Sequence, residues 1–328
     1  MKIQRDKAAQ WVAAGLLGLL AAAPCGAQSG AYPDKPVHLI VGFPPGGPND
    51  LIARLLAPKL GEVLKQPIII ENRNGSNGEI GTAFVSKAAP DGYTILIASN
   101  GSASISTGLG KKLPYDPRKD LSALTIVASN PMLLVVPPQS SATSVAQLIA
   151  MARAQPGKLS SASAGAAGPT HLALELLKSM AGIDIVHVPY KGGGPALTDI
   201  MGNQVDMYFG GLSTALPHAR AGKLRGLAVT SAARSGVAPE IPTIAETVPG
   251  YDASIWYGMF APPGTPPAIV ARLHDAIVDS LRSAEIHKRL LDQGMDPIDQ
   301  TPEQFAAFVR DDIDKWAKVA RAANIKLE

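Results

Sequence analysis

The stretch VHLIVGFPPGGPND at residues 37–50 decides the fold. Its first five residues suit a buried strand, its glycines suit a tight turn, and Pro48 suits the first position of a helix. The helical pattern continues over 51–64, and a second apolar β-branched run follows at Ile68–Ile70. A strand, a helix and a strand in this order predict a βαβ unit, and therefore a parallel sheet covered by helices.

The same alternation continues along the rest of the chain, so the fold class is α/β. The 328 residues exceed the usual size of one compact core, which favours two lobes. Further strands are expected at Thr94–Ala98, Leu133–Val136, Asp184–Val188, Val205–Phe209, Leu224–Thr230 and Ser254–Ala261. Further helices are expected at Ile80–Ala89, Val145–Ala154, His171–Ala181, Pro195–Gly202, Pro266–Ser283 and Pro302–Ala322.

The N-terminus has the pattern of a secretory signal peptide. Three basic residues within positions 2–7 precede an apolar run over 8–23, which is short for a permanent membrane span. We expect a signal peptide over 1–27, cleaved after Ala27, and hence a periplasmic protein. Attachment of a lipid at Cys25 is the less favoured alternative, because the residues around it fit a lipidation site poorly.

Composition argues against several classes of function. The signal carries three of the 30 basic and one of the 27 acidic residues, so its removal lowers the formal charge from +3 to +1. No dense basic stripe follows, and nucleic acid is not an expected partner. The single cysteine leaves with the signal. The chain lacks Gly-x-Ser-x-Gly, Ser-x-x-Lys, His-Glu-x-x-His and Cys/His metal motifs, so we expect no enzyme, no metal and no cofactor.

Two glycine turns echo each other in separate halves of the chain. VGFPPGGP at 41–48 and VPYKGGGP at 188–195 each place a glycine turn between a strand and a proline that begins a helix. Glycine lets backbone N–H groups approach a ligand, and a helix N-terminus attracts anions. Either turn alone is better explained as a tight connection. Two such turns, together with an export signal, favour a pair of anion cradles.

A third glycine-rich loop, SSASAGAAGPTH at 160–171, precedes a predicted helix and offers hydroxyl and amide donors. Its composition is also that of an ordinary flexible connection. It is not a Walker motif, because the Gly-Lys-Ser/Thr ending is absent.

At this point a series of short motifs resembles a known family. They are YPDKP (32–36), FPPGGPND (43–50), ENR (71–73), KAAPDGYT (87–94), KLPYDP (112–117), HVPYKGG (187–193), ALPH (215–218) and WYG (256–258). In this order, they resemble the substrate receptors of tripartite tricarboxylate transporters, also called Bug-type extracytoplasmic solute receptors. The resemblance covers essentially the whole chain after the signal.

The resemblance implies a type II periplasmic-binding-protein fold with a ligand cleft between two lobes. The first lobe would comprise 28–130 plus 231–328 and the second 131–230, with crossings near Asn130 and Thr230. Lobe closure would capture a small carboxylate-bearing molecule, held by backbone amides and ordered waters, for delivery to the membrane components of such a transporter. We expect a monomer.

Alternatives to this role are a sensor that docks a signalling partner and, with less support, an exported hydrolase or lyase. The loops expected to face the ligand supply the candidate ligand-binding residues. These are Phe43, Pro45, Gly46, Gly47, Pro48, Asn49, Asp50, Ser99, Asn100, Ser102, Gly165, Ala166, Ala167, Gly168, Thr170, His171, Tyr190, Gly192, Gly193, Tyr208, Gly210 and Gly211.

Several candidate positions depart from the family's usual pattern. Gly210 and Gly211 stand where an Asp-Asn pair is frequent, and Ala166 and Ala167 replace the more usual Asn-Gly. These changes predict a less polar or roomier pocket, and they leave the individual ligand open.

Four single residues also have structural interpretations. Asp50 suits a ligand contact and a helix first turn equally. His171 suits a cleft position or a helix cap, and Trp256 and Tyr257 are expected in the core.

Overall fold

The computed structural model describes residues 32–190 and 192–325. The expected signal peptide over 1–27, its cleavage site after Ala27, the alternative at Cys25, and Lys191 all lie outside the described residues. The chain divides into a unit that ends at Asp34 and a unit over residues 35–328, and the fold below is that of the second unit. Within the described residues, no helix combines the length and apolar character that a membrane span requires.

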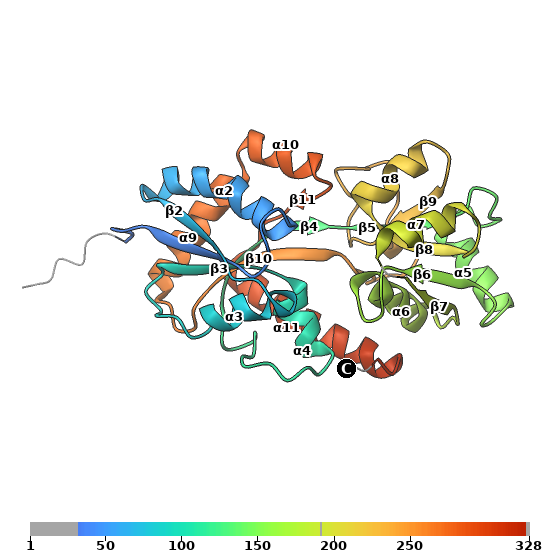
Figure 1. Cartoon of the computed structure of the whole chain (residues 1–328), viewed down its shortest axis with the longest axis horizontal. Helices are drawn as coiled ribbons and strands as arrows, with labels where there is room; N and C mark the ends of the chain where they lie inside the picture. Colours follow the sequence, from blue (N-terminus) through green and yellow to red (C-terminus); the bar gives the residue numbers. More distant parts are fainter. Residues whose placement is uncertain (1–31, 191, 326–328) are drawn as a thin grey trace, which may run out of the picture. The chain divides into compact units, whose positions relative to one another are not determined.

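Two mixed sheets form the framework (Figure 1). The first has the order β11-β4-β10-β3-β1-β2 and the second the order β7-β6-β8-β5-β9. The strands of the first sheet are β1 (Val37–Val41), β2 (Ile68–Asn72), β3 (Thr94–Ser99), β4 (Ser122–Asn130), β10 (Ile255–Ala261) and β11 (Asp296–Pro297). Those of the second are β5 (Met132–Val136), β6 (Ser160–Ser163), β7 (Val186–Pro189), β8 (Met207–Gly211) and β9 (Arg225–Val229).

The predicted parallel pairs are present in both sheets, but each sheet also contains antiparallel strands that the sequence pattern did not predict. Strand β1 pairs in parallel with β2 and β3, and β6 pairs in parallel with β7 and β8. Strand β10, however, is antiparallel to β3 and β4, and β5 is antiparallel to β8 and β9. The antiparallel pairs arise where the chain passes between the sheets, because β5 directly follows β4 and β10 is the first strand after β9.

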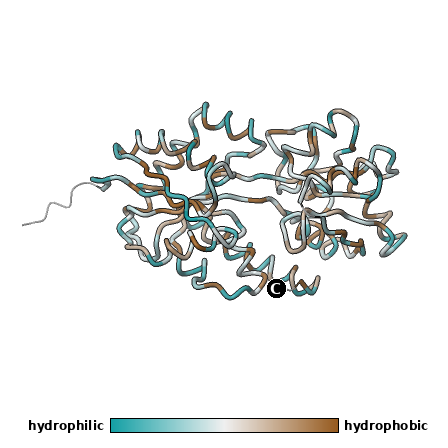
Figure 2. The backbone as a smooth tube through the Cα atoms, in the orientation of Figure 1, coloured by the Kyte–Doolittle hydropathy of each residue, from teal (hydrophilic) through white to brown (hydrophobic). Residues whose placement is uncertain are grey.

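Helices cover both faces of each sheet (Figure 1). Figure 2 shows hydrophobic residues along the central strands and hydrophilic residues on the outer turns. The helices of the first lobe are α2 (Pro48–Leu64), α3 (Glu79–Val85), α4 (Ser106–Gly108), α9 (Pro267–Leu281), α10 (Ala284–Asp292) and α11 (Pro302–Ala322), with a π-helical turn at Gly101–Ile105. Those of the second are α5 (Val145–Ala154), α6 (Pro169–Ala181), α7 (Gly193–Met201) and α8 (Leu212–Arg220). Short 3₁₀ turns lie at Ser76–Gly78 and Ile244–Glu246.

On one face of the first sheet, α11 packs against the central strands. Phe305 and Val309 of this helix share a buried cluster with Leu96 and Phe260. The ring of Phe305 lies so close to the backbone of β10 that a Cβ atom at Gly258 would come within 2.2 Å of it. Glycine is therefore required at this position for the helix to reach the sheet.

The core around the second sheet also includes residues that follow its last strand, β9, in the chain. Trp316 of α11 and the segment 244–253 share a buried cluster with residues of α5 and α6. The Tyr251 hydroxyl donates to the Ala173 carbonyl in α6 at 2.9 Å. Helix α11 thus packs on both lobes, with its first half on one core and its second half on the other.

The third glycine-rich loop begins later than the sequence suggested. Its first four residues, Ser160–Ser163, form strand β6 at the centre of the parallel part of the second sheet. These residues are small and polar, so they carry no apolar strand pattern. The loop proper runs over residues 164–168, between β6 and α6, and we call it the cavity loop.

Candidate functional site

A cavity of about 490 Å³ lies where loops of the two lobes meet. This volume is within the range of small-molecule sites. Its first-lobe wall comes from the turn before α2, the end of β3 and the start of β10, and its second-lobe wall comes from the cavity loop and the start of α6. The lining residues are Phe43, Pro48, Asn49, Asn77, Ser99, Asn100, Gly101, Ile105, Ala166, Ala167, Gly168, Pro169, Ile255 and Tyr257.

Helix α2 begins at this cavity without a side-chain cap. Its N-cap is Gly47 and its first residue is Pro48, so neither supplies an oxygen to the helix amides. Leu51 donates its N–H to the Gly47 carbonyl at 2.9 Å, but the N–H groups of Asn49 and Asp50 have no acceptor among the described residues. The side chain of Asn49 is also buried, and its Oδ1 atom lacks a partner there. Unsatisfied donors and a partnerless amide therefore meet at one end of the cavity.

The carboxylate of Asp50 holds the turn in place. It accepts hydrogen bonds from the Gly46 N–H at 2.9 Å, from Arg54 Nε at 2.8 Å and from Asn72 Nδ2 at 2.9 Å. Burial raises the pKa of Asp50, but these hydrogen bonds outweigh it and lower the pKa to about 2. Asp50 does not line the cavity, and its contacts are those of a residue that fixes the loop before α2.

The end of β3 and the residue after it contribute Ser99 and Asn100 to the first-lobe side of the cavity. Asn100 donates from Nδ2 to the carbonyl of Ser254 at 3.1 Å, which ties this wall to the start of β10. Ser102, which the sequence included among the ligand contacts, is fully buried beneath the cavity and accepts a hydrogen bond from Thr82 Oγ1 at 3.1 Å. Ser99 and Asn100 therefore reach the cavity, whereas Ser102 supports them from behind.

Helix α6 begins at the opposite wall in the same way as α2. Its N-cap is Gly168 and its first residue is Pro169, again without a side-chain cap. The N–H groups of Ala166, Gly168, Thr170 and His171 have no acceptor among the described residues. The Thr170 side chain does not face the ligand side, because its hydroxyl accepts the N–H of Ala164 at 2.8 Å. Two uncapped helices, one from each lobe, thus direct free N–H groups at one cavity.

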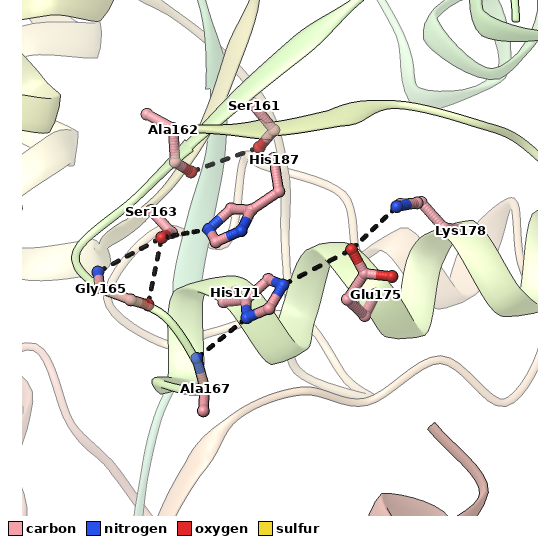
Figure 3. A network of polar contacts seen from close by, with 9 residues as sticks. All are labelled: Ser161, Ala162, Ser163, Gly165, Ala167, His171, Glu175, Lys178 and His187. Atoms are coloured by element: carbon pink, nitrogen blue, oxygen red, sulfur yellow. Dashed lines mark hydrogen bonds and ion pairs between the residues drawn. The ribbon is translucent and has the colours of Figure 1, made fainter. Parts of the chain in front are cut away.

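Two stacked histidines stand behind the cavity loop (Figure 3). The rings of His171 and His187 lie 3.7 Å apart at 8°. His171 accepts the Ala167 N–H at its Nδ1 atom at 3.0 Å, and its Nε2 atom faces Glu175 at 3.6 Å. Neither histidine lines the cavity.

His187 supports the loop through Ser163. Its Nε2 atom lies 2.6 Å from the Ser163 hydroxyl, which also bonds the N–H and the carbonyl of Gly165 (Figure 3). Burial, followed by the neighbouring charge of His171, lowers the pKa of His187 to about 4.

The second predicted cradle lies beside the cavity loop and does not line the cavity. Tyr190 and Gly192 donate their N–H groups to the carbonyls of Ser163 and Ala164 at 2.9 and 3.1 Å. A Cβ atom at Gly193 would come within 3.0 Å of the Tyr208 hydroxyl. The remaining sequence candidates outside the lining are Pro45, Gly46, Gly47, Gly165, Tyr208, Gly210 and Gly211.

The cavity wall carries no charged side chain among the described residues. Sequence reasoning missed Asn77, Ile105 and Ile255, and it assigned Tyr257 to the core; Gly101 and Pro169 lie in loops that it expected to face the ligand. Tyr257 is indeed buried, and burial raises its pKa to about 12, yet it also forms part of the wall. The motif WYG at 256–258 was the available signal for that strand.

Comparison with known proteins identifies the family. Residues 52–325 match the family model described as "Tripartite tricarboxylate transporter family receptor". The chain belongs to this family. The resemblance seen in its motifs and the two-lobed α/β fold are thereby confirmed.

Individual relatives of this receptor align over nearly their whole length. Protein BugT of Bordetella pertussis is 39% identical over 310 residues, which cover 94% of each chain. A protein of R. palustris, solved with adipate, is 36% identical, with a TM-score of 0.69 and coverage of 90% of this chain and 99% of that one. MatC from Rhodopseudomonas palustris, solved with bound malate, is 32% identical, with a TM-score of 0.65 and coverage of 88% and 99%.

The family and the fold are those of periplasmic solute-binding receptors, not of enzymes. Among the described residues, no group of His, Cys, Asp and Glu side chains could hold a metal ion.

Proposed function

We propose that this receptor captures a small dicarboxylate in the cavity, by closure of the two lobes, and delivers it to the membrane components of a tripartite transporter. One observation carries the proposal: the uncapped N-termini of α2 and α6 open into the same cavity, whose lining holds no charged side chain. A ligand with one carboxylate at each end would satisfy both sets of donors.

The physical basis is the anion affinity of helix N-termini. Free N–H groups and the helix dipole both favour negative charge at that end. Hydrogen bonds to an ionised carboxylate contribute about 1.5–3 kcal/mol each, because the acceptor is charged. Asn49 adds a side-chain amide to the α2 end, and rotation of that amide presents either its oxygen or its NH₂ group.

The relatives support the same ligand class, because adipate and malate are both dicarboxylates. The two helix starts lie on different lobes, so a ligand that engages both favours the closed arrangement. Ser99 and Asn100 would contribute polar contacts between the two ends.

Further parts of the proposal concern the setting. We propose export by the signal over 1–27, a periplasmic location, a monomeric receptor and no catalysis. The predicted ligand contacts at Tyr190, Gly192, Gly193, Tyr208, Gly210 and Gly211 remain predictions for the closed, ligand-bound form.

The test is native mass spectrometry of the exported protein as purified, followed by thermal-shift measurements with matched ligands. Adipate carries two carboxylates, hexanoate carries one on a chain of the same length, and adipamide carries none. We expect stabilisation to decrease in the order adipate, hexanoate, adipamide, because the number of carboxylates falls from two to none. A ligand at about 100 times its Kd raises the free energy of unfolding by about 2.7 kcal/mol. Malate serves as a shorter second dicarboxylate.

A shift with adipamide equal to that with adipate would overturn the dicarboxylate assignment. Absence of a co-purified acid and of any shift with carboxylates would overturn the proposed function itself.

A further inference from the structure

The cavity loop is held from behind by imidazole nitrogens. Ala167 adopts a left-handed backbone conformation, with φ of +56°, which a residue with a Cβ atom rarely takes. Its N–H donates to His171 Nδ1 at 3.0 Å (Figure 3), and His171 does not line the cavity. Gly165, two residues before Ala167, exchanges hydrogen bonds with the Ser163 hydroxyl through both its N–H and its carbonyl, and that hydroxyl also bonds His187. The conformation that exposes the neighbouring N–H groups to the cavity therefore depends on both rings.

This arrangement requires a specific protonation state of His171. Its Nδ1 atom must carry a lone pair, since it accepts the Ala167 N–H. The proton of the neutral ring then sits on Nε2, on the side that faces Glu175. A second proton could only go to Nδ1, where it would oppose the Ala167 N–H and abolish the hydrogen bond.

We propose that His171 is a positioning residue for the cavity loop, and that its protonation at Nδ1 releases the loop and weakens ligand binding at acidic pH. The regulation rests on the proposed function, because it concerns affinity at the same cavity.

Charged and titratable groups from two elements, α6 and β7, face His171. His171 faces Glu175 and Lys178 of its own helix, and Lys178 is paired with Glu175 at 2.9 Å. Strand β7 contributes His187, stacked at 3.7 Å, and two adjacent positive rings would repel each other. In the buried cluster, α6 also packs with Met207 and Phe209 of β8, with Trp316 and Val319 of α11, and with Tyr251.

Burial lowers the pKa of His187 to about 4, so His187 stays neutral at weakly acidic pH. Burial raises the pKa of Glu175, but the hydrogen bond from Lys178 and the nearby His171 ring outweigh burial and lower it, so Glu175 stays ionised. Glu175 and Lys178 are thus the charged groups beside Nε2 of His171, and His187 is the neutral ring stacked on it.

The test compares three forms of the full-length exported receptor, with adipate as the probe, by isothermal calorimetry at about pH 7.5 and about pH 5.5. His171→Leu removes the acceptor, and we expect a loss of about tenfold in affinity at the higher pH, typical of one lost hydrogen bond. His171→Asn places an oxygen near the Nδ1 position and cannot be protonated, so it should recover most of that loss. His287→Asn changes an exposed histidine of α10 and should behave as wild type.

The decisive readout is the difference in pH dependence. Titration of adipate itself affects all forms equally. We expect wild type to lose about tenfold more affinity than His171→Asn between the two pH values, because only wild type can take the extra proton. Parallel losses in wild type and His171→Asn would overturn the inference and leave the proposed function standing.

A measurement without ligand separates the two proposals. The amide resonance of Ala167 in the free protein should shift with pH in wild type, with one inflection, and should stay flat in His171→Asn. A flat wild-type resonance would overturn the inference even if no carboxylate binds. Failure of adipate and malate to bind at either pH bears only on the proposed function.

Discussion

A charge placed on the cavity loop gives the sharpest test of carboxylate binding at α6. Ala166 is exposed and lines the cavity, and its own N–H is among the free donors. Ala166→Asp would put a second carboxylate about 6 Å from one that accepts this N–H. In a partly exposed site, with an effective dielectric constant of about 40, the repulsion is about 1.4 kcal/mol, or about tenfold in Kd.

The assay is calorimetric titration with adipate at low and high salt. Screening should shrink the penalty as ionic strength rises, because the introduced charge is exposed. Ala166→Asn has nearly the same shape without the charge, so it should retain most of the affinity. Ala146→Asp makes the same charge change at an exposed position in the first turn of α5, away from the cavity.

Two results would refute the reasoning. Equal weakening in Ala166→Asp and Ala166→Asn would assign the effect to shape. Equal weakening in Ala166→Asp and Ala146→Asp would assign it to net charge, and would remove the carboxylate from the α6 N-terminus.

Three further predictions concern the fold and its motion. Asp50→Asn should destabilise the receptor by about 1–2 kcal/mol above pH 4. Because the folded pKa is lowered to about 2, the gap from wild type should narrow in acid unfolding curves as pH falls from about 4 toward 2. Gly258→Ala should lower stability to urea by about 1–3 kcal/mol, since its Cβ atom would meet the Phe305 ring at 2.2 Å, and Phe305→Leu in the same chain should recover part of it. Saturating adipate should reduce the radius of gyration in small-angle scattering, and superimposable profiles would contradict lobe closure.

Element boundaries were predictable where the sequence carries explicit start signals. The predicted bounds of α11 and α5 match the structure. At the start of α11, Thr301 and Gln304 form a capping box around Pro302, and Ser144 caps α5. Helix α8 was missed because Pro217 interrupts its pattern, although the proline falls near its end.

Strand β6 was missed for a different reason. Its residues are small and polar, and only tertiary packing buries Ser161 and Ser163 completely. These residues have no intrinsic preference for a strand, so the segment becomes a strand because it pairs with β7 and β8.

The sequence predicted the first-lobe side of the candidate site, but it did not predict which loop of the second lobe lies opposite, because that depends on strand order. The turn before α2 was predicted because a glycine N-cap followed by proline is a local signal. The sequence echo paired it with the turn before α7, whereas the cavity pairs it with the turn before α6. That choice depends on the order β7-β6-β8, which puts β7 at the edge and β6 inside, and no local pattern encodes that order.

Helix α11 has a consequence for how the molecule comes apart. Its first half contributes Phe305 and Val309 to one core, and its second half contributes Trp316 and Val319 to the other. If either lobe unfolds, α11 loses half of its packing contacts, and the core of the other lobe is weakened because it also contains residues of α11. The two lobes should melt as one cooperative unit, with a single calorimetric transition, although the chain contains two sheets.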